Sequence, residues 1–171
     1  MITSRDETVL FVNPFVDERE MFTLYLEAIG FHVLAVDTAE SALKLIVGFA
    51  VDAVVSRAPL SIRGSESLAL AREIRSHVAR HIPLVLLTTD AFTDLAAPIR
   101  AGYDLVLLLP VLPDDLAAAI GALVDRTRDQ SRDLPADEWT PFSQTLTTTV
   151  ARVLRTRAAV SGVGRIGRPG Q

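Results

Sequence analysis

Arg57 is a cation at the end of an apolar run, and this position makes it the first candidate for chemistry in the chain. The run Ala53–Val55 has the composition of a buried strand, and Ser56 and Arg57 follow it directly. Thr88 and Thr89 follow a second apolar run in the same way. Because a guanidinium and hydroxyl groups all donate hydrogen bonds, these side chains (Arg57, Ser56, Thr88, Thr89) could bind a small anion.

Three other patterns suggest chemistry but lack the partners that the chemistry needs. Residues 162–167 satisfy the glycine spacing of a dinucleotide-binding loop, yet only four residues follow them, too few for the helix and acidic residue of that site. Ser41 and Lys44 have the spacing of a penicillin-recognising nucleophile, without its companion motifs. His77 and His81 could share a metal on one helix face, but two ligands do not make a site. We therefore expect no metal and no cofactor.

Five short apolar runs alternate with longer amphipathic segments. Uniformly apolar runs are typical of parallel strands buried on both faces, and the segments between them are typical of crossover helices. The pattern predicts an α/β fold with a doubly wound, five-stranded parallel sheet, whose working site lies beyond the carboxyl ends of the strands. The expected strands are Val9–Val12, His32–Val36, Ala53–Val55, Leu84–Leu87 and Leu105–Leu108, and the expected helices span about 16–29, 38–47, 65–78, 93–102 and 113–132.

The first expected helix has two kinds of residue at helical spacing. Apolar residues recur along it at Met21, Leu24, Ala28 and Ile29, and this stripe predicts the face that packs on the sheet. The charged residues are then expected on the solvent side; they are Asp17, Glu18, Arg19, Glu20 and Glu27.

Charge and composition limit the classes of protein to which this chain can belong. The net charge of −4 divides unevenly, because five arginines against two acids give +3 in residues 134–171 and leave −7 for the rest. The chain has no cysteine, which excludes disulfides and thiolate metal sites. With no signal-peptide pattern and no apolar stretch near the ~20 residues of a membrane span, we expect a soluble cytoplasmic protein that does not enter a membrane.

The sequence predicts four segments. Residues 8–132 are expected to form the α/β domain and 133–139 a linker. Apolar residues recur at helical spacing in 140–157, which predicts an extra C-terminal amphipathic helix. Residues 158–171 are rich in glycine and arginine and are expected to be a flexible, disordered basic tail.

Several segments, in order and at matching spacing over about residues 8–125, resemble response-regulator receiver domains of the chemotaxis-regulator type. The segments that carry the resemblance are Val9–Phe31, Thr38–Leu43, Pro83–Thr89, Ala101–Asp104 and the pair Leu109–Pro110. The resemblance implies a flavodoxin-like sheet of strand order 2-1-3-4-5. It also implies a place in two-component, phosphorelay-type signal transduction of the bacterial kind.

The chemistry of that family has clear requirements. An aspartate attacks phosphorus to form an acyl phosphate, and two further acids hold Mg²⁺, which neutralises charge on the transferring group. A lysine and a hydroxyl stabilise the phosphoryl oxygens, and an aromatic residue on the fifth strand moves with that hydroxyl to signal the change.

This sequence departs from that pattern at nearly every position of the pocket. Arg57 stands at the phosphoacceptor position, and an arginine cannot attack phosphorus. The acidic pair is replaced by Asn13 and Pro14, the lysine of the Lys-Pro pair by Leu109 (before Pro110), and the switch aromatic by Val106; Thr88 keeps the family identity. The pocket's charge changes from about −2 to +1, so Mg²⁺, which needs anionic oxygen ligands, should not bind.

Two fates are open for Arg57. It could pair with Asp17 or Asp90 and fill the degenerate pocket, or it could bind the small anion described above. We favour the first interpretation.

The resemblance and its departures together predict a pseudo-receiver that is not an enzyme and that acts as a phosphorylation-independent protein-interaction module. By analogy with receivers, a signalling partner or a second copy in a homodimer would dock on the face formed by the helix at 93–102, the strand at 105–108 and the helix from 113. One alternative function is sensing of a small anion. Another is association with nucleic acid through the arginine-rich tail, which we consider the weaker reading because the main domain is acidic.

Overall fold

The computed structural model describes residues 6–59, 66–89 and 96–133. The chain divides into two compact units, Met1–Glu138 and Trp139–Gln171. The linker expected after residue 133, the helix expected at 140–157, the tail at 158–171 and Asp90 lie outside the described residues.

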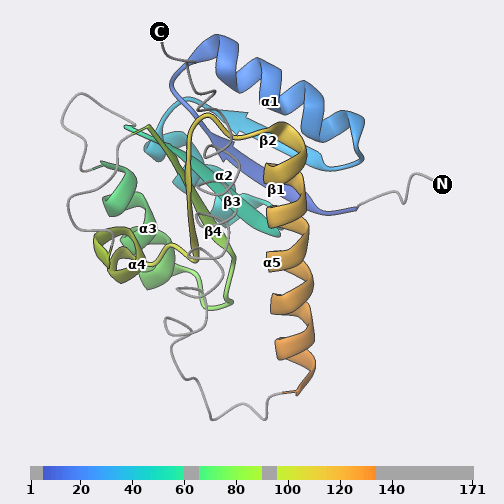
Figure 1. Cartoon of the computed structure of the whole chain (residues 1–171). Coiled ribbons are helices and arrows are strands. Elements are labelled where there is room, and N and C mark those ends of the chain that lie inside the picture. The colour runs from blue at the N-terminus through green and yellow to red at the C-terminus, as the bar shows by residue number, and fades with distance from the viewer. Residues whose placement is uncertain (1–5, 60–65, 90–95, 134–171) are drawn as a thin grey trace, which may run out of the picture. The chain divides into compact units, whose positions relative to one another are not determined.

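Five parallel strands form one sheet in the order β2-β1-β3-β4-β5, which confirms the predicted fold class (Figure 1). No helix in the described ranges is both long and apolar enough to span a membrane. The strands are β1 (Thr8–Val12), β2 (His32–Val36), β3 (Ala53–Ala58), β4 (Leu84–Thr88) and β5 (Leu105–Leu108), and the helices are α1 (Val16–Ala28), α2 (Ala39–Gly48), α3 (Glu66–His77), α4 (Ala96–Ala101) and α5 (Pro113–Asp133).

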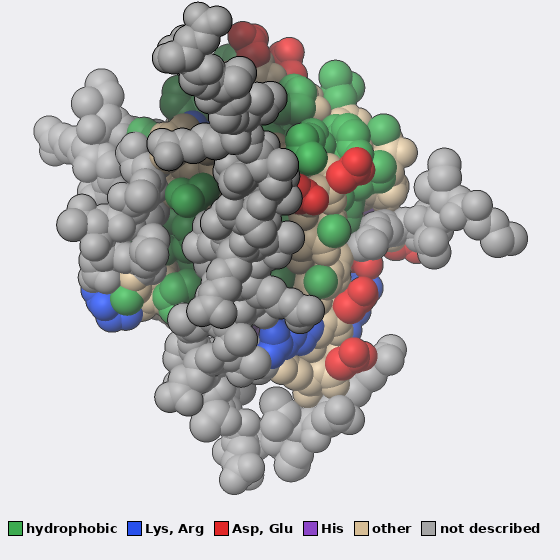
Figure 2. All heavy atoms as spheres, in the orientation of Figure 1, with side chains coloured by type: hydrophobic (Ala, Val, Ile, Leu, Met, Phe, Trp, Pro, Cys, Tyr) green, Lys and Arg blue, Asp and Glu red, His purple; other side chains and the backbone are tan. Residues whose placement is uncertain are grey.

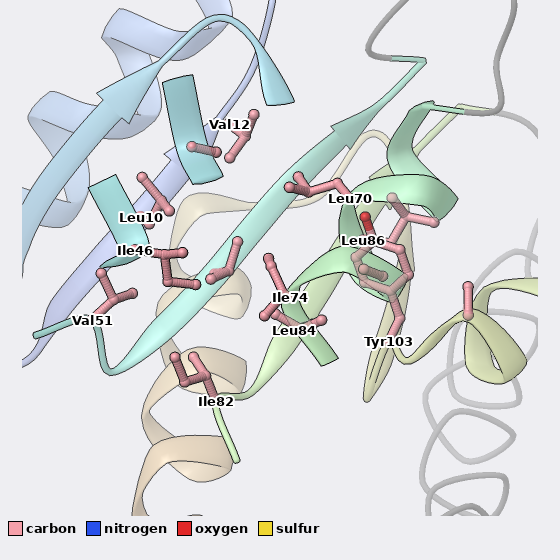
Figure 3. Close-up of a cluster of buried hydrophobic side chains, with 14 of the residues drawn as sticks. Leu10, Val12, Ile46, Val51, Leu70, Ile74, Ile82, Leu84, Leu86 and Tyr103 are labelled. Carbon is pink, nitrogen blue, oxygen red and sulfur yellow. The ribbon is translucent and has the colours of Figure 1, made fainter. Parts of the chain in front are cut away.

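Two buried clusters of side chains cover the two faces of the sheet, since successive residues of a strand point to opposite faces. The first, which we call the α1–α5 cluster, joins odd-numbered strand residues such as Val55 and Leu87 to Phe22 and Leu26 of α1 and Leu116 of α5. The second, the α2–α3–α4 cluster, takes even-numbered residues of the same strands (Figure 3); its members include Leu10, Val54, Leu86, Ile46, Leu70, Ile74 and Tyr103. Helices α1 and α5 therefore lie on one face of the sheet and α2, α3 and α4 on the other (Figure 1).

The predicted orientation of α1 is wrong for three of its four apolar residues, and only Ile29 packs against the α1–α5 cluster. Phe22 and Leu26 are buried, while Met21 is 46% and Leu24 69% exposed, and Ala28 is also exposed. Phe22 packs edge-on against Phe11 of β1, with ring centroids 5.8 Å apart. Burying the larger aromatic surface removes more apolar area from water, and this favours the stripe of Phe22.

The ends of several elements follow local rules that the sequence shows directly. Thr38 caps α2, and its Oγ1 accepts a hydrogen bond from the Ser41 amide at 3.2 Å. Gly30 and Gly102 follow α1 and α4 with φ of 103° and 117°, a region that favours glycine. α5 begins at Pro113 and has Asp114 and Asp115 in its first turn, as expected from the helix dipole.

Candidate functional site

The carboxyl edge of the sheet brings Asn13 and Arg57 together with the start of α1. Asn13 directly follows β1 and is fully buried. Its backbone N–H donates to the Val36 carbonyl of β2 at 2.9 Å. Arg57 is the fifth residue of β3 and is only 6% exposed. Its odd position in the strand directs the side chain to the α1–α5 face, so the guanidinium meets the first turn of α1.

Glu18 of α1 is the acidic partner of Arg57. The Arg57 Nε donates to Glu18 Oε2 at 3.1 Å, and the Glu18 side chain is 24% exposed. The guanidinium carbon also lies 5.1 Å from the centre of the Phe15 ring. A cation over an aromatic face and against a carboxylate is stabilised by both contacts, which offset part of the desolvation of the charge.

Asn13 connects this ion pair to the backbone, and its amide group suits that task better than a carboxylate would. Its Oδ1 accepts from the Phe15 amide at 2.9 Å, and its Nδ2 donates to Glu18 Oε2 at 3.2 Å. Arg19 Nη1 donates to the Asn13 carbonyl at 2.6 Å. An aspartate at this position would place a second negative charge against Glu18, whereas asparagine donates a hydrogen bond to it.

The expected pairing of Arg57 with Asp17 is therefore corrected: among the described residues its acidic partner is Glu18, and the alternative, Asp90, lies outside them. Asp17 is exposed on the outer side of α1. Glu18 was expected on the solvent side, but it lies four residues before Phe22 on the same helical stripe and so faces inward with it. The correct helix orientation is the signal that would have identified Glu18.

The four side chains expected to form an anion site do not share one face of the sheet. Ser56 is fully buried and, one residue from Arg57, points to the opposite face. Thr88 is buried and pairs with Ala58 in the β3–β4 register, while Thr89 is exposed. Arg57 and Ser56 therefore cannot act on one small ligand from one side of the sheet.

The other site positions expected from the sequence are apolar, and three of the four are partly buried. Leu109 packs against the α1–α5 cluster and Val106 against the α2–α3–α4 cluster. Pro14 is half-buried and Pro110 exposed. Leu109 is held next to Thr88, because its amide donates to the Thr88 carbonyl at 2.8 Å.

Tyr103 is a buried polar residue that sequence reasoning did not single out. It is 3% exposed, and its hydroxyl donates to the Ser67 carbonyl at 2.7 Å, which ties the loop before β5 to α3. Burial raises the pKa of Tyr103, and the Ser56 hydroxyl lowers it by a smaller amount. The phenol therefore stays protonated in the folded protein at ordinary pH.

A second charged cluster lies at the other end of the sheet, around Asp104. Arg75 Nη2 donates to Asp104 Oδ2 at 2.8 Å, and His81 Nε2 lies 3.2 Å from Asp104 Oδ1. Arg75 also donates to the Gly102 and Ile82 carbonyls, so this cluster joins α3 to the loops before β4 and β5. His81 and the exposed His77 have different acidic neighbours, and the described residues contain no group of three potential metal-binding side chains.

Solved structures provide the comparison that decides the fold. A receiver domain protein from Methanospirillum hungatei JF-1, described as CheY-like, superposes with a TM-score of 0.64 at 20% identity, covering 74% of this chain and 99% of the other. A putative response regulator from Chloroflexus aurantiacus J-10-fl gives 0.63 at 26% identity, over 71% of this chain and 100% of the other. The fold is that of a response-regulator receiver domain. A response regulator from Thermotoga maritima gives a similar result, with a TM-score of 0.63 at 23% identity, over 71% of this chain and 99% of the other.

Sequence comparison is consistent with the receiver fold. The phosphate regulon transcriptional regulatory protein PhoB of Pseudomonas aeruginosa is 26% identical over 133 residues. The match covers 77% of this chain and 57% of the relative, so the chain spans little more than half of the relative's length. No protein-family model matches the sequence.

Proposed function

We propose that this chain is a phosphorylation-independent, receiver-like interaction module of two-component-type signalling and not an enzyme. One observation carries the proposal: Arg57, which the sequence resemblance assigns to the receiver's acceptor position, is already bound to a carboxylate of its own chain, Glu18. A permanently charged guanidinium cannot accept a phosphoryl group, and its ion pair occupies the end of β3 where the reaction would take place.

The charges around this position also argue against the family's metal. Arg57 and Arg19 contribute two positive charges near Asn13, and Glu18 contributes one negative charge that is already hydrogen-bonded to Arg57 and Asn13. Mg²⁺ keeps its waters unless hard anionic oxygens replace them, and a carboxylate already shared with a guanidinium is a poor replacement.

Incubation with acetyl phosphate and Mg²⁺ is therefore expected to leave the protein unmodified. Intact-protein mass spectrometry would detect an added phosphoryl group, and an active receiver domain treated in parallel would serve as the positive control. A stoichiometric, acid-stable but base-labile adduct on this chain would overturn the proposal.

The surface of α1 supports a role in protein interaction. Phe15, Val16, Met21 and Leu24 at or on this helix are 46–69% exposed, and Leu112, just before α5, is 64% exposed. Figure 2 shows hydrophobic side chains beside acidic ones over the area where Figure 1 places α1. Contiguous exposed apolar side chains with a polar rim are typical of protein-binding surfaces. They favour α1 as the docking surface over the face of α4, β5 and α5, which the sequence analysis expected by analogy.

Leu24→Glu is expected to reduce partner capture at least ~10-fold without changing the free energy of unfolding, because Leu24 is 69% exposed and a charge there disrupts an apolar contact. Affinity capture from a lysate of the native organism, with quantitative mass spectrometry, would measure the loss. If the partner is a second copy of this chain, sedimentation velocity would measure the loss of dimer in Leu24→Glu instead.

The matched control is Val47→Glu, which places the same charge at an 83% exposed position on α2. Ala119→Glu on α5 tests the other face, since the helical repeat turns Ala119 well away from Asp114, which contacts Tyr25 of α1. Loss of capture with Ala119→Glu and not with Leu24→Glu would assign docking to the face of α4, β5 and α5.

A further inference from the structure

Helix α1 begins beside Arg57 without a side-chain cap. Its N-cap residue, Phe15, has no side-chain acceptor for the first-turn amides, and the Asn13 Oδ1 accepts from the amide of Phe15 itself. The first amide groups of a helix have no acceptor within the helix, and the helix dipole makes this end attractive to anions. With 13 residues, α1 is long enough for this effect to matter.

Arg57 provides an independent indication of a ligand at the same place. Its Nη1 is buried, and no acceptor for it exists within the described ranges, although Nε is bound to Glu18. The guanidinium faces the start of α1, because it contacts Glu18 in the first turn and the ring of Phe15 at the N-cap. A buried guanidinium N–H without an acceptor is uncommon, since each such donor loses its hydrogen bond to water.

We propose that Arg57 and the N-terminus of α1 form a binding site for a small oxyanion, such as inorganic phosphate. The anion would bind non-covalently, accepting from Arg57 Nη1 and from first-turn amides of α1. Phe15, which is 46% exposed, covers the guanidinium and would have to move aside. The site differs from the one expected from the sequence, since Ser56 and Thr89 take no part, and it does not depend on the proposed interaction role.

Glu18 is the internal competitor for this site. Its carboxylate holds Nε and places a negative charge next to the bound anion, while Arg57 and Arg19 leave a local charge of one positive unit. Among the acids of the first turn, Asp17 is exposed and so is screened by solvent. An oxyanion is expected to bind more tightly than chloride, because several oxygens can accept from the guanidinium and the amides together.

Glu18→Gln and Arg57→Gln are expected to have opposite effects on phosphate binding. Glu18→Gln removes the competing charge and should raise affinity on the order of tenfold, whereas Arg57→Gln should abolish binding. Glu20→Gln removes an exposed charge from the same helix and should leave affinity nearly unchanged.

Titration of the ¹⁵N-labelled protein with inorganic phosphate, at constant ionic strength set with sodium chloride, tests the proposal by NMR. We expect saturable shifts of the Val16 and Asp17 amides and of Arg57 Nε in the wild type, at lower phosphate concentration in Glu18→Gln. Parallel titrations with acetate and with sulfate compare the affinity for a planar and for a tetrahedral oxyanion.

Shifts equal to those with chloride alone, or retained in folded Arg57→Gln, would overturn the proposal. If Arg57→Gln does not fold, failure of Glu18→Gln to raise affinity would overturn it instead. Mass spectrometry after incubation with acetyl phosphate tests the interaction proposal, and the NMR titration tests anion binding. The two proposals can therefore fail independently.

Discussion

Replacing Phe22 by alanine is expected to reduce the free energy of unfolding by about 3–5 kcal/mol. Phe22 is 2% exposed, belongs to the α1–α5 cluster and packs edge-on against Phe11 at 5.8 Å. The substitution removes the aromatic contact and leaves a cavity between α1 and the sheet, and both losses add to the transfer free energy of the ring. Since domains of this size are stable by about 5–15 kcal/mol, the variant should lose a large fraction of its stability.

Urea denaturation followed by circular dichroism measures this effect, and α1 itself contains the matched control. Leu24→Ala changes an apolar residue of similar size two positions further along, but Leu24 is 69% exposed, so the expected change is within about 0.5 kcal/mol. A large loss for Leu24→Ala with a small one for Phe22→Ala would restore the helix orientation expected from the sequence.

The orientation of α1 was difficult to predict because the helix has two apolar stripes. Met21, Leu24 and Ala28 form one at i, i+3 and i+7, and Phe22 and Leu26 form the other. The second stripe continues backward through Glu18, a charged residue of a type that ordinarily faces solvent. Glu18 faces inward only because Arg57 and Asn13, distant in the sequence, bind its carboxylate.

Predicting the core face and predicting the partner of Arg57 were therefore a single problem. Periodicity within α1 cannot solve it, since the deciding contact joins residues 39 positions apart in the chain.

Features fixed by local rules were predicted well. The apolar runs correspond to the five strands, and their order in the sheet agrees with the one implied by the receiver resemblance. Thr38, Gly30 and Gly102 lie at helix ends, as the side chain of threonine and the φ preference of glycine favour. The location of Arg57 at the carboxyl edge followed from the same pattern. The grouping of Ser56 with Arg57 failed, although strand alternation alone shows that neighbouring residues point to opposite faces.

Glu18→Ala is expected to reduce the free energy of unfolding by about 2–3 kcal/mol in phosphate-free buffer. Removing one partner of a buried ion pair leaves the other charge buried and uncompensated, which typically costs about 3–5 kcal/mol. Glu18 is 24% exposed, so water can reach the vacated space and the expected loss is smaller. Glu20→Ala, at an exposed position of the same helix, should change stability by less than about 0.5 kcal/mol.

The companion variants separate the ion pair from simple loss of packing. Arg57→Met replaces the guanidinium by an apolar chain and leaves Glu18 hydrogen-bonded to Asn13 and partly hydrated, so it should cost less than Glu18→Ala. In the double variant no charge remains buried without a partner, and its stability should approach the wild type. The two single losses then fail to add by at least about 2 kcal/mol, and urea denaturation of the four proteins measures this coupling energy. Additive losses in the double variant would show that Glu18 acts through packing alone, and would contradict a stabilising role for the Arg57–Glu18 ion pair.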